Sequence, residues 1–292
     1  MTPRSWLFVP GDSPSKMQKA VTTAADAVIL DLEDSVAGSR KAEARRCVRE
    51  FASIYAGPVE LWVRINPAGS TDWERDLETA VAAGVAGVVV PKAEGGPMTN
   101  QVAGMLDALG APPGLSLLPI ATETPAALFA LGAYAAAGPR LRGLTWGAED
   151  LSAAIGAVTA RTPDGLYTPL YELARSLCLA GAATAQVPAI ETVYPDFSDL
   201  RGLADYAARG RRDGFVGMMA IHPAQIPVIH AAFSPTEAEL KYARRVLEAF
   251  EADPDAGTLS LDGKMLDAPH LRQARRTLER GRPDRGGGEP ST

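Results

Sequence analysis

Histidine and cysteine are scarce in this chain, and their scarcity limits the metal chemistry that it can support. Three histidines and two cysteines occur among its 292 residues. Two cysteines form neither a disulfide framework nor a zinc site, and Cys47 and Cys178 both fall in segments of helical character. Three histidines argue against a histidine-rich metal centre. Any bound metal is therefore expected to be a hard ion held by oxygen ligands, such as Mg²⁺, Mn²⁺ or Ca²⁺.

Long apolar runs and basic patches are also missing from the sequence. Glycine, proline or a charged residue interrupts each apolar stretch well before the roughly 20 residues that a membrane helix needs. Residues 1–14 carry too short an apolar run for a signal peptide. The formal net charge is −6, and no basic patch is interleaved with aromatic residues. We therefore expect a cytoplasmic protein that binds neither membrane nor nucleic acid.

Eight short apolar segments alternate with longer segments of helical character, which is the pattern of a parallel sheet. Several of these segments are nearly all apolar, as in strands that are buried on both faces. Amphipathic helices are expected between them, for example over Asp72–Ala83 and Pro125–Ala137. The eight predicted strands are Ser5–Val9, Ala27–Leu32, Val59–Ile65, Gly87–Pro91, Ser116–Ala121, Gly143–Trp146, Val187–Thr192 and Phe215–Ile221.

This pattern predicts an α/β fold, a (β/α)₈ TIM barrel, as the catalytic domain over residues 1–233. One repeat is longer than the others, and its excess lies in residues 156–170, which we expect to be an inserted loop before a helix over Leu170–Ala183. The main alternative is a doubly wound open sheet. Such a sheet normally has fewer strands, and its dinucleotide-binding form needs a glycine fingerprint that this chain lacks.

The strand pattern stops after Phe233, and we expect a C-terminal helical extension over residues 234–281. It would consist of helices over Pro235–Glu251 and His270–Arg280, joined by a loop over residues 254–269. Residues 282–292 are rich in glycine and proline and are expected to form a disordered tail.

Charged and polar residues concentrate where the predicted strands end. In a barrel enzyme the C-terminal ends of the strands carry the chemistry. The N-terminal ends show no comparable concentration, so the sequence predicts one catalytic face. Taken in chain order, the residues at these ends are Asp12, Asp31, Glu33, Asp34, Arg64, Asn66, Lys92, Glu123, Glu149, Asp150, Glu191 and His222.

Glu123 and Asp150 are the candidate metal ligands. They follow adjacent strands, the fifth and the sixth, so both can point into the same barrel mouth. Magnesium commonly takes one or two carboxylates from a protein and keeps its other positions for water and substrate. The competing interpretation is that both residues only cap the helices that follow them.

Arg64 is the candidate partner for a carboxylate or an oxyanion, because its planar guanidinium pairs bidentately with carboxylates and stays charged. The competing interpretation is a salt bridge to Asp31, Glu33 or Asp34 on the neighbouring strand, which is compatible with a functional role. Residues 147–148, Gly-Ala ahead of a helix, offer backbone N–H groups as an anion site.

Lys92 and Asp267 each have a functional and a structural interpretation. A lysine at a strand end could form a Schiff base as a neutral amine, but neighbouring carboxylates favour the ammonium form and a counter-ion role. Asp267 precedes Ala-Pro-His-Leu, and from the residues alone it is predicted to be a helix N-cap.

Nine segments taken in order, from about residue 4 to residue 280, resemble the citrate lyase β-subunit-like family, which belongs with the malyl-CoA lyases in the HpcH/HpaI aldolase group. The combination of these segments is highly specific. They are RSWLFVPGDSPSKMQKA, DAVILDLEDSV, KAEAR, VRIN, VVVPKAE, PIATETP, WGAEDL, GFVGMMAIHPAQI and DGKMLDAP. The resemblance implies a TIM barrel with C-terminal helices, assembled as homotrimers or hexamers, that binds Mg²⁺ and cleaves or forms 3-hydroxyacyl-CoA-type thioesters.

The resemblance also implies roles for individual residues. Glu123 and Asp150 match the family's magnesium ligands, with Glu123 also next to the substrate, and Arg64 matches its substrate-binding arginine. Gly147 and Ala148 match the backbone segment that holds the carboxylate of the 2-oxo acid.

Asp34 and Lys92 match polar groups around that site, and Asp267 matches the catalytic acid that a neighbouring subunit supplies as a base in CoA-dependent relatives. Two positions depart from the pattern. Met218 stands where many relatives have a basic residue, and Glu191 stands where aspartate is common. Both departures bear on thioester recognition, and neither touches the metal pair.

The expected reaction is a Mg²⁺-dependent aldol-type (Claisen) equilibrium between a 3-hydroxyacyl thioester and an acetyl-thioester plus a 2-oxo acid such as oxaloacetate or glyoxylate. The acid, and the choice between CoA and an acyl-carrier protein, stay open at this stage. So do three alternatives. They are a malate synthase or malyl-CoA thioesterase-type activity that gives a free acid, a Schiff-base aldolase that uses Lys92, and a partner-dependent lyase subunit with little activity alone.

Overall fold

The computed structural model describes residues 2–254 and 256–281. The chain divides into two compact units, one over residues 2–232 and one that begins at Phe233. The predicted disordered tail, residues 282–292, lies outside the described residues. No helix in the described part of the chain is long and apolar enough to cross a membrane.

The first unit is built on eight parallel strands that form one sheet, in the order β5-β4-β3-β2-β1-β8-β7-β6. Isolated bridges from Leu117 to Leu141 and from Ile120 to Thr145 connect the two ends of this order, β5 and β6. The predicted TIM barrel is therefore confirmed, and the doubly wound alternative is wrong. The strands are β1 (Ser5–Pro10), β2 (Ala27–Asp31), β3 (Glu60–Arg64), β4 (Gly87–Val90), β5 (Ser116–Pro119), β6 (Leu144–Thr145), β7 (Ala189–Glu191) and β8 (Gly217–Ala220).

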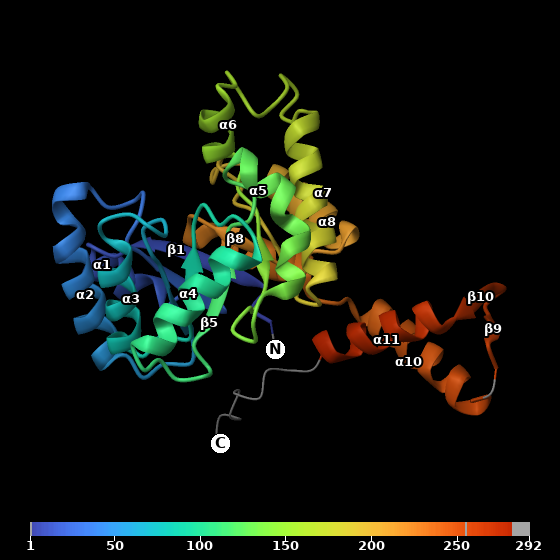
Figure 1. Ribbon diagram of the computed structural model, residues 1–292. Coiled ribbons are helices and arrows are strands. Elements are labelled where there is room, and N and C mark those ends of the chain that lie inside the picture. Colours follow the sequence, from blue (N-terminus) through green and yellow to red (C-terminus); the bar gives the residue numbers. More distant parts are fainter. Residues whose placement is uncertain (1, 255, 282–292) are drawn as a thin grey trace. The chain divides into compact units, whose positions relative to one another are not determined.

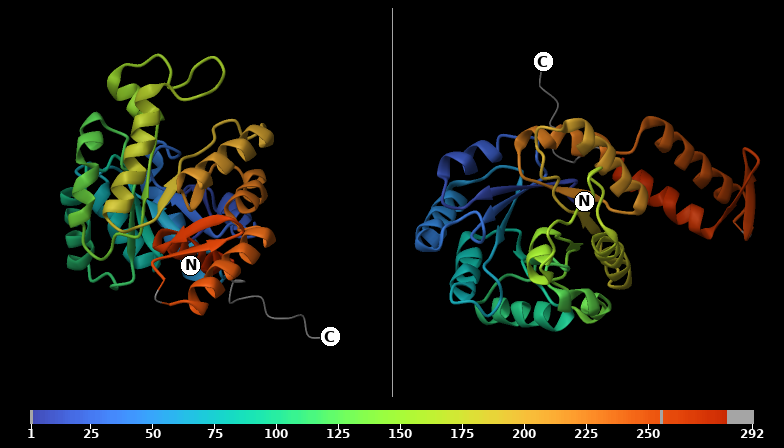
Figure 2. Two further views of the ribbon diagram at one scale, coloured as in Figure 1. Left: turned by 90° about the vertical axis from the view of Figure 1, so that its right-hand side faces the viewer. Right: turned by 90° about the horizontal axis from the view of Figure 1, so that it is seen from above.

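Helices lie outside the strands of this unit, as the view from above shows (Figure 2, right). The helix predicted over Pro125–Ala137 is divided into α5 and a 3₁₀ helix over Leu131–Ala136. The predicted inserted loop lies between α6 and α7, at the top of Figure 1. The helices of this unit are α1 (Pro14–Ala20), α2 (Lys41–Ile54), α3 (Trp73–Ala83), α4 (Gly96–Ala108), α5 (Pro125–Ala130), α6 (Glu149–Ile155), α7 (Pro169–Thr184), α8 (Leu200–Asp213) and α9 (Ile226–Phe233).

Aromatic and branched side chains fill the barrel interior. Trp6 and Trp62 meet edge to face, with ring centroids 5.0 Å apart, and they pack with residues such as Ile29, Val89 and Ile190 from other strands. All the barrel strands except β6 contribute side chains to this layer, either directly or from a residue next to the strand. The filled interior leaves the strand ends as the place where a site can form.

The second unit contains a β-hairpin that the sequence interpretation missed. Residues 254–269 were expected to be a loop, but β9 (Thr258–Leu261) and β10 (Lys264–Asp267) pair antiparallel. Asp262 and Gly263 form the turn with φ angles of 52° and 74°, and an Asp-Gly pair with positive φ is the preferred two-residue hairpin turn. The strands escaped notice because they are short and half exposed.

Two helices complete the second unit and share a small apolar core with the hairpin. They are α10 (Glu237–Ala252) and α11 (Ala268–Arg280). Buried residues from both helices and from β10 meet in this core, and they include Ala243, Val246, Leu266 and Ala274.

An ion pair between Arg4 and Asp26 fastens the N-terminal ends of β1 and β2. Arg4 donates three hydrogen bonds to the Asp26 carboxylate, at 2.7, 3.0 and 2.9 Å. Burial alone would raise the pKa of Asp26, but the hydrogen bonds from Arg4 and the charges of Arg4 and His230 outweigh burial and lower it. The charged form of Asp26 is thus favoured by folding.

We expect Asp26→Asn to lower the free energy of unfolding by about 1–2 kcal/mol at pH 5 and above. Because the pKa of Asp26 is lower in the folded state, its contribution is present above the unfolded pKa of about 3.9. It is lost as the pH falls through the folded value, which lies below the unfolded one, so the variant should approach wild-type stability only in strong acid. Urea unfolding at several pH values measures this difference. A difference that stays constant over this range would contradict the assignment.

Candidate active site

A cavity of about 180 Å³ lies at the C-terminal ends of the barrel strands. Its wall combines apolar side chains with one guanidinium and several carboxylates. The lining residues that matter below are Phe8, Asp34, Arg64, Ile120, Glu123, Thr145, Trp146, Gly147, Ala148, Asp150, Tyr167, Val193 and Met219.

Arg64 reaches this cavity from the end of β3 and is held by a bidentate pair with Asp31. The Arg64 Nε and Nη2 atoms donate to the two Asp31 carboxylate oxygens, both at 2.7 Å. Arg64 Nη1 lies 3.0 Å from Glu33 Oε2 and 4.0 Å from Asp34 Oδ2. The salt bridge considered as an alternative therefore exists, and Arg64 still lines the cavity.

The Asp31–Arg64 pair is buried, and each partner fixes the charge of the other. Asp31 is 1% exposed and also accepts the N–H groups of Glu33 and Ser35. Burial would raise the pKa of Asp31, but Arg64 and these donors lower it. Burial would lower the pKa of Arg64, but Asp31 and the nearby glutamates raise it. Arg64 is therefore a permanent cation in a fixed orientation.

Glu123 is a buried carboxylate without sufficient positive charge around it. It is 5% exposed, and its Oε2 accepts the main-chain N–H of Lys92 at 2.6 Å. Burial, together with the charges of Glu33 and Asp150, raises the pKa of Glu123 to about 8. A divalent cation beside this group would relieve that imbalance.

The capping interpretation of Glu123 and Asp150 is wrong. The N-cap of α5 is Thr124, whose side chain accepts the N–H of Ala127. The N-cap of α6 is Ala148, so Asp150 lies in the first turn of that helix. Neither carboxylate is used as a cap.

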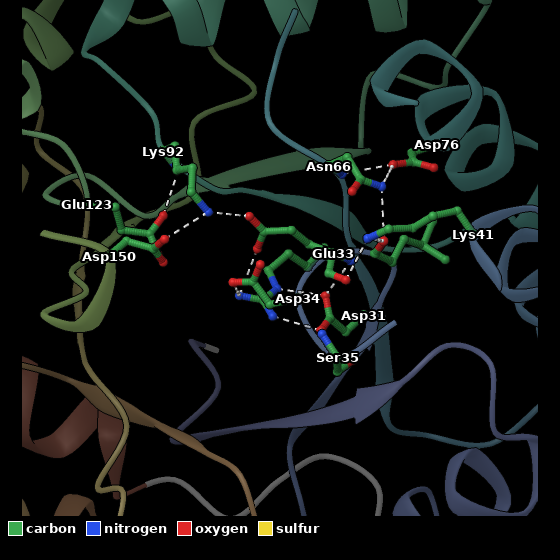
Figure 3. A network of polar contacts seen from close by, with 12 residues as sticks. Asp31, Glu33, Asp34, Ser35, Lys41, Asn66, Asp76, Lys92, Glu123 and Asp150 are labelled. Atoms are coloured by element: carbon green, nitrogen blue, oxygen red, sulfur yellow. Dashed lines mark hydrogen bonds and ion pairs between the residues drawn. The ribbon is translucent and has the colours of Figure 1, made fainter. Parts of the chain in front are cut away.

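Lys92 connects the acidic groups across the barrel mouth (Figure 3). Its Nζ lies 2.6 Å from Glu33 Oε1 and 3.2 Å from Asp150 Oδ1. Burial would lower the pKa of Lys92, but Glu33, Glu123 and Asp150 raise it. A Schiff base needs the neutral amine, so this environment argues against the Schiff-base alternative. Lys92 also has a φ of 51°, a conformation that costs energy for a residue other than glycine.

Gly147 lies beside Glu123, but its N–H group does not match the expectation of a free donor. The N–H of Gly147 donates to Thr122 Oγ1 at 3.0 Å, so it is already used. Ala148 lines the cavity. A side chain at position 147 would come within 3.1 Å of Glu123 Oε1, which explains why glycine stands there.

The remaining two candidates occupy different places. Asp34 lines the cavity with a side chain that is 60% exposed. Asp267 belongs to the second unit, where it is the N-cap of α11 and its Oδ1 lies 2.6 Å from His270 Nδ1. The predicted capping role of Asp267 is thus confirmed. The structure brings the other candidates together around one cavity, with Lys92 behind it.

Glu191 and Met218, the two departures from the family pattern, lie side by side on β7 and β8. Glu191 is fully buried and accepts hydrogen bonds from Trp146 Nε1 at 2.5 Å and Tyr206 Oη at 2.9 Å. Its ionic partner is Arg175 on α7, with Nε at 2.9 Å from Glu191 Oε2. The basic partner thus comes from a helix and not from position 218.

Sequence reasoning missed the aromatic wall that this ion pair supports. Trp146 and Tyr167 both line the cavity, with ring centroids 5.1 Å apart. Tyr167 lies in the segment that was interpreted only as an inserted loop. Its position next to Trp146 becomes evident only when the chain is folded.

Comparison with known proteins gives consistent matches over nearly the whole chain. A family model described as HpcH/HpaI aldolase/citrate lyase matches residues 4–223, and a model described as C–C bond lyase of the TIM-barrel fold matches residues 170–283. A citrate lyase subunit beta-like protein of Mycobacterium tuberculosis is 36% identical over 275 residues, 94% of either chain. The citrate lyase subunit beta of Escherichia coli strain K12 is 36% identical over 96% of this chain and 93% of that protein.

Two further matches carry more specific names. A (3S)-malyl-CoA thioesterase of Cereibacter sphaeroides is 34% identical, over 94% of this chain and 93% of that protein. A crystal structure of CitE from M. tuberculosis in complex with magnesium, acetoacetate and coenzyme A superposes with a TM-score of 0.80. It is 34% identical and covers 95% of this chain and 97% of that chain.

We expect Asp31→Ala to lower the free energy of unfolding by about 3–5 kcal/mol, because it leaves the buried Arg64 guanidinium without its main partner. Urea unfolding at neutral pH measures this loss. Asp34→Ala is the matched control, since its exposed carboxylate is 4.0 Å from Arg64, and it should change stability by less than about 0.5 kcal/mol. Equal effects of the two substitutions would show that the Asp31 pair does not hold the site.

Proposed function

This chain belongs to the HpcH/HpaI aldolase/citrate lyase family of carbon–carbon lyases, and from that premise we propose that it reversibly cleaves a 3-hydroxyacyl-CoA-type thioester. The products would be an acetyl-thioester and a 2-oxo acid such as oxaloacetate or glyoxylate. The observation that carries the proposal is the convergence of Glu123, Asp150 and Arg64 on one cavity at the catalytic end of the barrel.

The residues present fit Mg²⁺. Among the described residues no three His, Cys, Asp or Glu side chains are grouped so that they could hold a metal by themselves. Two carboxylates, Glu123 and Asp150, line the cavity, and magnesium commonly uses one or two carboxylates with water and substrate. Solved structures of relatives contain magnesium with oxaloacetate or pyruvate. Glu123 and Asp150 would hold the ion, and bound Mg²⁺ would supply a Lewis acid that polarises the keto group of the 2-oxo acid.

Arg64 and its neighbours supply the fixed electrostatics of the reaction. The Arg64 guanidinium would stabilise negative charge on the keto oxygen as the carbon–carbon bond forms or breaks. Because its pairing with Asp31 already fixes its orientation, it would not need to reorient during the reaction. Lys92, which contacts both Glu33 and Asp150, would reduce the repulsion between these two carboxylates. The close approach allowed by Gly147 and the backbone of Ala148 would position the carboxylate of the acid, with Asp34 at the edge of the cavity.

Asp267 is the proposed base, contributed by a neighbouring copy of the chain in a homotrimer or hexamer. In the condensation direction its carboxylate would take a proton from the methyl group of the acetyl-thioester, and the resulting enolate carbon would attack the keto carbon. The keto oxygen then becomes an alkoxide and takes up a proton from water. In the cleavage direction the 3-hydroxyl group gives its proton to water, the carbon–carbon bond breaks as the keto group re-forms, and its electron pair passes to the methylene carbon of the acetyl group, which takes up a proton from the Asp267 carboxyl group. The acyl carrier would be CoA or an acyl-carrier protein.

A second candidate function is hydrolysis of the thioester, which would release a free acid. The observation that supports it is the match, at 34% identity, to relatives named (3S)-malyl-CoA thioesterase. The same cavity would bind the hydroxyacyl group, and water would attack the thioester carbonyl, with free CoA as the second product.

Mass spectrometry of reaction products tests both functions. Purified protein would be incubated with Mg²⁺ and acetyl-CoA, and offered oxaloacetate, glyoxylate and pyruvate in turn, with EDTA as the control. A metal-dependent condensed thioester supports the lyase, and a free acid with CoA release supports the hydrolytic function. No product, despite Mg²⁺-dependent binding of an acid, would indicate a lyase subunit that requires a partner.

Glu123→Ala should lose Mg²⁺ binding and activity together, because it removes one of the two proposed ligands. We expect a fall in rate of at least about 100-fold. Isothermal titration with Mg²⁺ and a product assay measure the two effects on one sample. Glu43→Ala, which removes an exposed carboxylate on α2, is the control and should change neither. Normal metal affinity in Glu123→Ala would remove this residue from the metal site.

Asp267→Asn should slow the reaction by about 100-fold or more and leave Mg²⁺-dependent binding of the 2-oxo acid intact. The amide cannot act as the base, but it keeps the size of the side chain. Asp262→Asn, in the turn of the same hairpin, is the matched control and should keep the wild-type rate. A wild-type rate in Asp267→Asn would exclude this residue from the mechanism.

A further inference from the structure

Thr145 carries a buried hydroxyl group that the proposed mechanism does not use. The residue is 1% exposed, and within the described part of the chain its Oγ1 atom has no hydrogen-bond partner. A buried hydroxyl without a partner is costly, because it gives up its hydrogen bonds to water. Native proteins leave few such groups, and those that remain call for an explanation.

The position of Thr145 places this hydroxyl in the wall of the active-site cavity. Thr145 is the last residue of β6 and lines the cavity, as does Gly147 two residues later. Its main-chain oxygen accepts the N–H of Ala121 at 2.8 Å, which fixes β6 against the segment that leads to Glu123. Two residues of extended chain span at most about 7 Å. Thr145 therefore lies close to the proposed metal pair and to the binding site of the acid.

No side chain that lines the cavity is hydrogen-bonded to this hydroxyl in the described structure. Ile120, Val193 and Met219 are apolar and line the same cavity. The cavity's arginine, Arg64, pairs with Asp31 and Glu33 and makes no hydrogen bond to Thr145 in the described structure. The hydroxyl of Thr145 is therefore available to a molecule bound in the cavity.

We propose that Thr145 is a further substrate-contacting residue, whose hydroxyl donates a hydrogen bond to an oxygen of the bound 2-oxo acid. This inference rests on the proposed function, because it takes the occupant of the cavity to be that acid. A threonine hydroxyl has one donor and two acceptor positions, so it suits a carboxylate or keto oxygen. In the free protein this hydroxyl is buried without a hydrogen bond, and the bound acid would remove the free-energy cost of leaving it unpaired.

The pair Thr145→Val and Thr145→Ser separates this role from a structural one. Valine keeps the shape of the side chain and removes the hydroxyl. Because that hydroxyl has no protein partner, Thr145→Val should melt at the wild-type temperature or above it. Its affinity for the acid should fall about tenfold, the loss expected for one hydrogen bond. Thr145→Ser keeps the hydroxyl and should recover most of the affinity.

The measurement is isothermal titration of wild type and both variants with glyoxylate, pyruvate and oxaloacetate, each in the presence of Mg²⁺, with thermal unfolding of the same samples. Unchanged affinity in Thr145→Val would overturn the assignment, as would an affinity loss accompanied by an equal loss in Thr145→Ser and a lower melting temperature. Glu123→Ala is titrated alongside. If it loses binding while Thr145→Val does not, the proposed function stands and the Thr145 inference fails. If wild type binds none of the acids, both fail.

Discussion

The buried ion pair between Asp31 and Arg64 is the interaction on which the rest of the site depends. These two residues are directly opposite each other in the parallel pairing of β2 and β3, and both of their hydrogen bonds are 2.7 Å long. A shift of one residue in that pairing would turn one of the two side chains away from the barrel interior. It would leave a buried charge unpaired, at a cost of about 3–5 kcal/mol. The register of β2 and β3 and the orientation of Arg64 therefore depend on each other.

From Arg64 a sequence of alternating charges crosses the barrel mouth. Glu33 lies between Arg64 and Lys92, and Lys92 lies between Glu33 and Asp150. Two cations are shared among four acidic groups, and burial together with the charges of Glu33 and Asp150 raises the pKa of Glu123. A site with this imbalance favours a divalent cation, because one ion can neutralise Glu123 together with Asp150, which shares Lys92 with Glu33.

The strands and the strand-end residues could be predicted from the sequence because both depend on local pattern. A strand such as β4, with the sequence GVVV, is apolar on both faces, and a charged residue immediately after it can lie only at the mouth. Contacts between distant segments leave no such trace. The N–H of Gly147 is occupied by Thr122, and Glu191 is paired with Arg175 on a helix. Neither contact could be inferred from spacing, and the hairpin of β9 and β10 was missed because its four-residue strands are too short for a clear alternation.

The Glu191–Arg175 pair shows where likeness to relatives can be carried over to this chain and where it stops. Glu191 is the longer acid, and the buried Met218 beside it offers no charge. The cation that pairs with Glu191 comes instead from α7, as Arg175, and the same carboxylate accepts the indole N–H of Trp146. No hydrogen bond or ion pair joins the proposed metal ligands or Arg64 to this pair in the described structure: Arg64 ends β3, Glu123 follows β5, and Asp150 lies in the first turn of α6. The residue types at positions 191 and 218 therefore do not act directly on the proposed metal ligands or on Arg64. They do act on the aromatic wall, because Trp146 donates to Glu191 and packs against Tyr167. Differences in substrate choice between this chain and its relatives are expected to arise at that wall.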